Sequence, residues 1–322
     1  MKIICPSSSF SRKDRINLLF KSADAWIRSA PLNRLITLFG GEIDAVNFSD
    51  RISALNDFVN VWDFRKKLVE QQLVNERWNI CNDDFVNANE AFILQQAAEL
   101  GLVYAQAPEM IPTHILPLGG ARYANLNRVE LAKQVIDQNG FKEPTKVVAL
   151  SGMRTINEKE RPAVDTYAPD ATTEFDAVNA ALETVFHLGK DFQEDRREHT
   201  NPHLNSCVRE YQRSYRGIGV SSIAAPSQCP DRRANSRDTF DYFCALYNIN
   251  DTSSLLLVTS QIYVPYQLLK FADIAIESGF DVECIGTQMG LSPHLNASSY
   301  LQEIKGTVNA VYSLFRKYEN EI

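Results

Sequence analysis

Residues suited to ligand chemistry gather where predicted strands end. Three apolar segments, 114–120, 146–152 and 254–260, each run into glycine, a small hydroxyl residue or an arginine. These strand ends supply Gly119, Gly120, Arg122, Ser151, Gly152, Arg154, Thr259, Ser260 and Gln261. In an open parallel sheet, ligands bind outside the carboxyl ends of the strands. Small residues there let backbone N–H groups approach a polar or anionic ligand, although the glycines could also serve only to make tight turns.

Two predicted helix starts carry further polar groups. Ser236 is the expected N-cap of a helix over 236–247, and Arg237 follows it. A helix N-terminus beside an arginine can hold a phosphate or carboxylate, but the pattern equally fits a plain capped helix. Glu174 falls in the first turn of a helix over 173–188. It either interacts with the helix dipole or binds ligand hydroxyls and acts as a base.

A metal site is not expected. His199, His203 and Cys207 are spaced four apart and would line one face of a continuous helix. Pro202 interrupts that run and disfavours the helix. The charged surroundings indicate a solvated loop instead. The sequence also lacks a zinc-finger pattern, a Walker loop, G-x-G-x-x-G and G-x-S-x-G.

The elements that must position these residues alternate between strand and helix from about residue 108. The predicted strands are 114–120, 146–152, 215–225, 254–260 and 281–286, and the predicted helices are 127–139, 173–188, 236–247 and 265–278. Asn127 with Glu130 fits a capping box for the first helix. The alternation predicts an α/β fold, a parallel sheet with helices on both faces. A helix over 297–318 closes the chain.

Residues 1–107 differ from the rest in showing only helical periodicity. All three tryptophans, Trp26, Trp62 and Trp78, lie here and are expected to anchor helix packing. We therefore predict two domains, a helical region over 1–107 and an α/β domain over 108–322. The polar stretches 154–172 and 191–213 are predicted to be loops, either binding loops or surface insertions.

Composition narrows the classes of partner and the compartment. The 322 residues include 33 basic and 40 acidic side chains, giving a net charge of -7, which disfavours binding to nucleic acid or to anionic membranes. Apolar runs fall short of the roughly 18 residues that a membrane span needs, and the N-terminus lacks a signal-peptide core. The six cysteines are scattered without a C-x-x-C pair and are expected to be reduced. We expect a cytoplasmic protein; the oligomeric state is not indicated.

Five short motifs, taken in order, carry a family resemblance. They are Leu118-Gly119-Gly120, Ser151-Gly152-Met153, Thr173-Glu174, Ser236-Arg237-Asp238-Thr239-Phe240-Asp241 and Val258-Thr259-Ser260-Gln261-Ile262-Tyr263-Val264-Pro265-Tyr266-Gln267. Over about residues 114–287 the chain thereby resembles the YdcF/SanA/ElyC family of Rossmann-like domains. It departs from the family where Tyr263 and Tyr266 replace a histidine and an arginine.

The resemblance implies a pocket for a polar, anionic, nucleotide-like small molecule, S-adenosylmethionine among the candidates. It implies ligand contacts from the strand-end residues and from Ser236, Arg237, Thr239 and Tyr263. Glu174 and Asp241 would bind hydroxyls or move a proton during group transfer or hydrolysis. The alternative is a non-catalytic binding or sensor protein in which the helical region is an interaction module. The replacements at Tyr263 and Tyr266 favour that alternative.

Overall fold

The computed structural model describes residues 2–70, 79–141, 145–288 and 295–322. Contacts divide the chain into two compact units. One comprises Met1–Ala105, Gln261–Val282 and Gln288–Ile322, and we call it the helical unit. The other comprises Gln106–Ser260 and Glu283–Thr287, and we call it the sheet unit.

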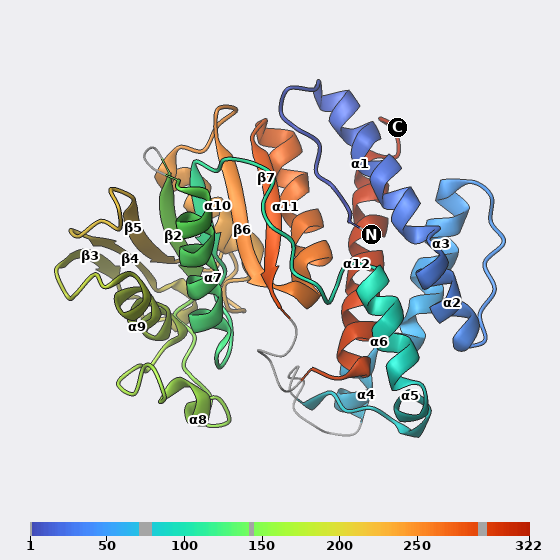
Figure 1. Cartoon of the computed structure of the whole chain (residues 1–322), viewed down its shortest axis with the longest axis horizontal. Coiled ribbons are helices and arrows are strands. Elements are labelled where there is room, and N and C mark those ends of the chain that lie inside the picture. Colours follow the sequence, from blue (N-terminus) through green and yellow to red (C-terminus); the bar gives the residue numbers. More distant parts are fainter. Residues whose placement is uncertain (1, 71–78, 142–144, 289–294) are drawn as a thin grey trace. The chain divides into compact units, whose positions relative to one another are not determined.

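The described part of the helical unit includes α1 (Arg12–Ile27), α2 (Ala30–Leu38), α3 (Phe48–Phe58), η1 (Val59–Trp62), α4 (Phe64–Glu70), α5 (Asp84–Ala88), α6 (Glu90–Glu99), α11 (Val264–Ser278) and α12 (Ala297–Tyr318). The short 3-10 turn η4 (Gln261–Tyr263) leads into α11. The 22-residue α12 runs through this unit and contacts α3, α6 and α11, which surround it (Figure 1).

Sequence signals explain where these helices begin. Ser11, Asn47 and Asp83 cap α1, α3 and α5 by accepting a hydrogen bond from a first-turn backbone N–H. Trp26 and Trp62 are fully buried in the core of the unit, as expected, while Trp78 lies outside the described residues. The prediction that the first hundred residues are helical is confirmed. Asn89 separates α5 from α6.

The units do not follow the predicted boundary at residue 107 throughout. The segments that bear α11 and α12 group with the N-terminal helices rather than with the sheet. The apolar residues of these two helices that pack with α1, α2 and α3 include Leu269, Ala272, Ile304 and Val308. The helical core is therefore completed by the last helices of the chain.

The sheet unit is built on seven strands: β1 (His114–Pro117), β2 (Lys146–Ser151), β3 (Phe192–Arg197), β4 (Ser206–Tyr211), β5 (Gly219–Ala224), β6 (Ser254–Ser260) and β7 (Asp281–Thr287). Their order across the sheet is β3-β4-β5-β2-β1-β6-β7. Strands β5, β2, β1 and β6 pair in parallel, while β3 and β4 add an antiparallel edge. The predicted α/β fold is confirmed.

Helices of the sheet unit cover both faces of this sheet. On one face, α7 (Ala124–Asn139) and α9 (Glu174–Phe186) bury Val129 and Val178 against strand residues such as Val147 and Ala149. On the other face, α10 (Ser236–Tyr247) places Phe243 and Tyr247 beside the ring of His114. Figure 1 shows α7 and α9 on the same side of the strands.

Three details of the sheet unit correct the sequence predictions. The charged stretch 191–213, predicted to be a loop, forms the β3–β4 hairpin, because its charged side chains lie on an exposed edge where strands tolerate them. The first helix begins at Ala124, so the predicted capping box of Asn127 and Glu130 is wrong. The polar stretch 154–172 contains a short helix, α8 (Arg161–Val164).

Within the described ranges, no helix combines the length and the apolar character of a membrane span. The long α12 has an apolar face that packs in the helical core and a polar remainder.

Candidate functional site

The candidate site lies where the strand order reverses. From the central β1 the chain proceeds to β2 and β5 on one side, and later to β6 and β7 on the other side. In open α/β sheets, ligands bind outside the carboxyl ends of the two strands that flank such a switch point, here β1 and β6. Gly119 follows β1, and Ser260 ends β6. The sequence prediction that strand ends meet at one edge is thus met for these two strands.

A buried arginine joins the ends of these two strands. The Arg128 guanidinium donates to the carbonyls of Leu118 (2.7 Å) and Gly119 (2.6 Å) and to the Ser260 hydroxyl (3.2 Å). A Cβ added at Gly120 would lie 2.9 Å from the same guanidinium. Glycine is favoured here because Arg128 and the Cβ of Ala124 both approach closely. The N–H of Gly120 donates to the side chain of Asn125 in α7 (2.8 Å), which orients the turn.

Glu174 overhangs the glycine turn from the first position of α9. Its backbone N–H donates to the carbonyl of Arg154 (2.8 Å), which anchors the start of the helix against the end of β2. Its Oε2 accepts from the Arg154 Nε (3.1 Å) and Nη2 (3.0 Å). Its Oε1 lies so near Gly119 that a Cβ there would overlap it. Within the described residues, no protein donor bonds Oε1, so this oxygen can accept from a ligand.

Arg154 holds a second carboxylate besides Glu174. The Glu160 carboxylate accepts hydrogen bonds from the Arg154 Nη1 (2.6 Å) and Nη2 (3.0 Å) in a bidentate pair. Glu160 is almost fully buried, and it also accepts from the N–H of Asn157 (2.8 Å). One guanidinium thus bridges the helix α9 and the stretch that carries α8.

Burial governs the ionisation of this cluster. Desolvation raises the pKa of Glu174, and the positive charges of Arg154 and Arg128 oppose that rise. Burial by itself lowers the pKa of Arg154, yet hydrogen bonds and charge from Glu160 and Glu174 raise it above its ordinary value. The arginine therefore stays charged, and Glu174 is a carboxylate whose proton affinity is increased by burial.

The other residues at the strand ends make structural contacts. The Ser151 hydroxyl donates to the carbonyl of Ile223 (3.2 Å), and the Gly152 carbonyl accepts from the N–H of Phe175 (3.2 Å). Arg122 adopts a left-handed backbone (φ 55°), and its side chain donates to the carbonyl of Lys159 (3.2 Å). Thr259 is buried, and its hydroxyl meets no protein partner in the described residues.

The start of α10 differs from the expectation. Ser236 is the first helical residue and is exposed, so the prediction that it is the N-cap is wrong. Asn235 caps the helix, and its side-chain oxygen accepts from the N–H groups of Arg237 (2.8 Å) and Asp238 (3.0 Å). These N–H groups are consequently taken before any anion arrives.

Two charged side chains of α10, Arg237 and Asp241, are paired with each other. The Arg237 Nε bonds both oxygens of Asp241 at 2.8 and 2.9 Å, one turn along the helix. The Thr239 hydroxyl donates to the carbonyl of Asn235 (3.1 Å). Together with the occupied cap, this pairing makes the start of α10 a weaker anion seat than the sequence indicated.

Gln261 and Tyr263 belong to the helical unit. Gln261 is buried, and its Nε2 donates to the carbonyl of Gly101 (2.7 Å). Tyr263 packs against the core of that unit. Of the residues that the sequence predicted for the site, Gly119, Gly120, Arg154, Glu174 and Ser260 are therefore the ones that direct contacts bring together.

Sequence reasoning missed two members of this cluster. Arg128 occupies a core-facing position of α7 beside the buried Val129, and a cation on an apolar helix face was the available signal. Glu160 lies in a polar stretch where many charges look alike, and no pattern distinguished it.

Metal-binding residues do not cluster in the described part of the chain, where no group of three histidine, cysteine or acidic side chains could hold an ion. Cys207 is buried in β4, whereas His199 precedes the short turn η3 (Pro202–Leu204), which contains His203.

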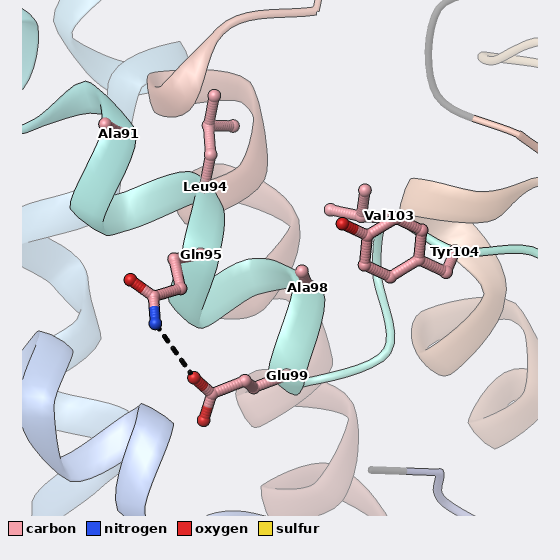
Figure 2. A pocket seen from close by; sticks show the side chains of 7 residues that line it. All are labelled: Ala91, Leu94, Gln95, Ala98, Glu99, Val103 and Tyr104. Carbon is pink, nitrogen blue, oxygen red and sulfur yellow. Dashed lines mark hydrogen bonds between the residues drawn. The ribbon is translucent and has the colours of Figure 1, made fainter.

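A separate surface hollow of about 600 Å³ occurs in the helical unit (Figure 2). It is open and shallow, and α6 supplies most of its lining. The lining residues are Ala91, Leu94, Gln95, Ala98, Glu99, Val103 and Tyr104. Gln95 bonds the Glu99 carboxylate (3.5 Å), and Arg34 pairs with the same carboxylate (2.6 Å). The polar side chains that line the hollow therefore already bond protein partners.

The chain is similar to a known domain family and to known mycobacterial proteins. The Rv3785 N-terminal domain model matches residues 11–101, the stretch that carries α1 to α6. The chain is 27% identical over 342 aligned residues to uncharacterized protein Rv3785 of Mycobacterium tuberculosis and to uncharacterized protein Mb3814 of Mycobacterium bovis. Each alignment covers 98% of this chain and 95% of the relative. No solved structure matches the chain. The chain is thus similar, across the parts that form both units, to mycobacterial proteins whose names assign no activity.

Proposed function

We propose that the sheet unit binds a polar, nucleotide-like small molecule at the carboxyl ends of β1 and β6. The observation that carries this proposal is the carboxylate of Glu174. Arg154 holds one of its oxygens, and the other projects over the Gly119 turn without a protein donor in the described residues. A buried carboxylate oriented in this way is suited to accept hydrogen bonds from ligand hydroxyl or amino groups.

The anionic part of such a ligand would lie beyond the Gly119–Gly120 turn, where the chain enters α7, because the N–H groups of the turn itself bond the Leu150 carbonyl and the Asn125 side chain. The 16-residue α7 has no side-chain cap, so its positive N-terminal end can receive an anion. This replaces the start of α10 as the proposed anion seat, because Asn235 already caps that helix. The arrangement agrees with the resemblance to YdcF-like domains, which remains a prediction.

The proposed chemistry is group transfer or hydrolysis, with Glu174 moving the proton. Its pKa is raised by burial, which brings it nearer to the range in which a carboxylate works as a general acid or base. Asp241 is a less suitable proton carrier, since both of its oxygens bond Arg237.

The alternative is binding without turnover, and the position of Tyr263 favours it. This tyrosine, which stands where the family has a histidine, packs against the core of the helical unit. A sensor that binds a ligand in the sheet unit and uses the helical unit for interactions would need no basic group at that position.

Native mass spectrometry and calorimetry with AMP, ADP and S-adenosylmethionine test the proposal. We expect binding by the wild type and a loss of about tenfold or more in Glu174→Gln, since the substitution removes a charged acceptor. Glu130→Gln, an exposed change on α7 with the same loss of charge, is the matched control. Equal affinities in the two variants would contradict the site. Turnover that disappears in Glu174→Gln would favour the enzyme over the sensor.

A further inference from the structure

We propose that Glu160 is a built-in occupant of an anion site on Arg154, and that an anionic ligand group displaces it and frees residues 155–172, here called the α8 loop. The inference deepens the proposed function, since it identifies a cation for the ligand and a regulation of the same site. It rests on the proposed function for the location of that ligand.

Arg154 is the cation best placed to meet a ligand at this edge. It follows the end of β2 by three residues, and it bonds the Glu174 carboxylate that overhangs Gly119. Its side chain is 22% exposed, so solvent reaches it. Its donors are nevertheless taken, because Glu174 receives the Nε and Nη2 groups while Glu160 receives Nη1 and Nη2.

The Glu160 pair has the geometry that an arginine offers to a ligand. Two parallel N–H donors bond two oxygens of one anion, as they would bond a phosphate or a ligand carboxylate. An anion can therefore take this edge of the guanidinium only by replacing the carboxylate of Glu160. The edge toward Glu174 would remain in place and keep the arginine oriented.

Of the two carboxylates, Glu160 is the one that can leave. Glu174 is fixed at the start of α9, where its own N–H bonds the Arg154 carbonyl. Glu160 belongs to the α8 loop, whose ends are anchored by the Thr155–Thr173 bridge and by two bonds from Thr172 to the Asp176 carboxylate (2.8 and 3.1 Å), so the part that can move lies between them. The Tyr167 hydroxyl donates to the Arg122 carbonyl (2.9 Å), and Arg122 donates back to the Lys159 carbonyl (3.2 Å).

A small apolar cluster gives the α8 loop its closed position. Ile156, Val164, Ala168 and Ala171 are buried against Ala177 of α9. These are mostly small side chains, and the area that they bury is modest compared with the main core of the sheet unit. The loop is therefore held closed by this cluster together with the ion pair, and loss of the pair weakens the closed state.

The experiment measures pyrophosphate binding by calorimetry in the wild-type full chain, Glu160→Gln and Glu158→Gln. Glu158 is exposed and lies two residues away in the same loop, so its substitution removes the same charge without touching Arg154. Removal of the competing carboxylate should raise the affinity of Glu160→Gln for pyrophosphate by about tenfold or more. Glu158→Gln should bind pyrophosphate as the wild type does.

Hydrogen–deuterium exchange of the unmodified protein provides a readout that does not depend on a variant. Saturating pyrophosphate should increase deuterium uptake in peptides from residues 155–172, and Glu160→Gln should show that uptake without ligand. Glu160→Asp, which keeps the charge but shortens the reach, should lie between the two.

Unchanged or weaker binding by Glu160→Gln would overturn the inference, as would slower exchange of the α8 loop when pyrophosphate binds. Absence of pyrophosphate binding in every variant would also overturn it. Failure of the proposed function has a different signature. In that case AMP, ADP and S-adenosylmethionine do not bind, while Glu160→Gln still gains affinity for pyrophosphate.

Discussion

The Gly119 turn gives the sharpest prediction, because two glycines at neighbouring strand ends differ in their surroundings. A Cβ at Gly119 would lie 2.9 Å from the Leu150 carbonyl oxygen, 3.0 Å from the Cα of Ser151, and closer still to the Glu174 carboxylate. The nearest atom to a Cβ at Gly152 would be 4.0 Å away. Neither glycine has a left-handed φ, so backbone conformation does not separate them.

The expected cost follows from these contacts. Two of the three atoms that a Cβ at Gly119 would meet belong to the backbone and cannot rotate away, so the turn must shift by a few tenths of an ångström, at about 1–3 kcal/mol. Movement of Glu174 would strain its bonds to Arg154, which are charge-assisted and contribute about 1.5–3 kcal/mol. We therefore expect Gly119→Ala to lower the free energy of unfolding by about 2–4 kcal/mol. Gly152→Ala should be neutral, or stabilising by about 0.4–1 kcal/mol.

Urea unfolding followed by far-UV circular dichroism measures both variants. All three tryptophans lie in the first 105 residues, so fluorescence reports on the helical unit and should change less than the dichroism in Gly119→Ala. A double variant, Gly119→Ala with Glu174→Ala, removes the closest contact and should cost less than the sum of the two single changes. Equal stability of Gly119→Ala and Gly152→Ala, or strict additivity in the double variant, would refute the close packing of Glu174 on the turn.

Three further predictions concern buried groups. Arg15 is buried and donates to three backbone carbonyls, so Arg15→Met should lower the free energy of unfolding by about 2–4 kcal/mol in urea titrations. Arg12→Met removes an exposed ion pair and should have little effect. Similar losses in the two variants would contradict this prediction. Burial, with a smaller contribution from Lys146, lowers the pKa of His114 from 6.5 to about 4, so the unfolded chain takes up this proton first. The free energy of unfolding should fall by about 1–2 kcal/mol as the pH drops from 6.5 to 4, which is less than the full pKa shift implies because the ring is half-buried. His114→Phe should lose this pH dependence. An unchanged dependence of stability on pH in that variant would argue against a buried, neutral His114. Cys81 is exposed, whereas Cys207 is buried and its burial raises the pKa of its thiol to about 12, so a thiol reagent should label Cys81 first. Peptide mapping that finds both cysteines labelled at the same rate would count against the burial of Cys207 in β4.

Local pattern was sufficient wherever one face of an element is buried continuously. The strand 254–260 and the helices 236–247 and 297–318 have the predicted bounds, because their apolar residues repeat with the period of the element. Pattern failed at the β3–β4 hairpin. An exposed edge strand has little apolar face to reveal it, and charged residues such as Glu194 and Arg196 are favourable there.

The candidate site divides in the same way. The sequence by itself determined that small and polar residues follow the strands, because glycine and serine next to apolar runs can be recognised without a structure. It also determined that Glu174 begins a helix. It could not determine which residues meet, because contacts between distant segments depend on strand order, and strand order is not written in local periodicity.

Only the tertiary structure decided the partners of the charged side chains. It placed Arg128 beneath the Gly119 turn and joined Arg154 to both Glu160 and Glu174. It also paired Arg237 with Asp241 and assigned Tyr263 to the helical unit. The physical reason is that a charge in a folded protein is stabilised by whatever group the fold brings within a few ångströms, and the sequence offers several candidate partners for each charge without showing which one the fold selects.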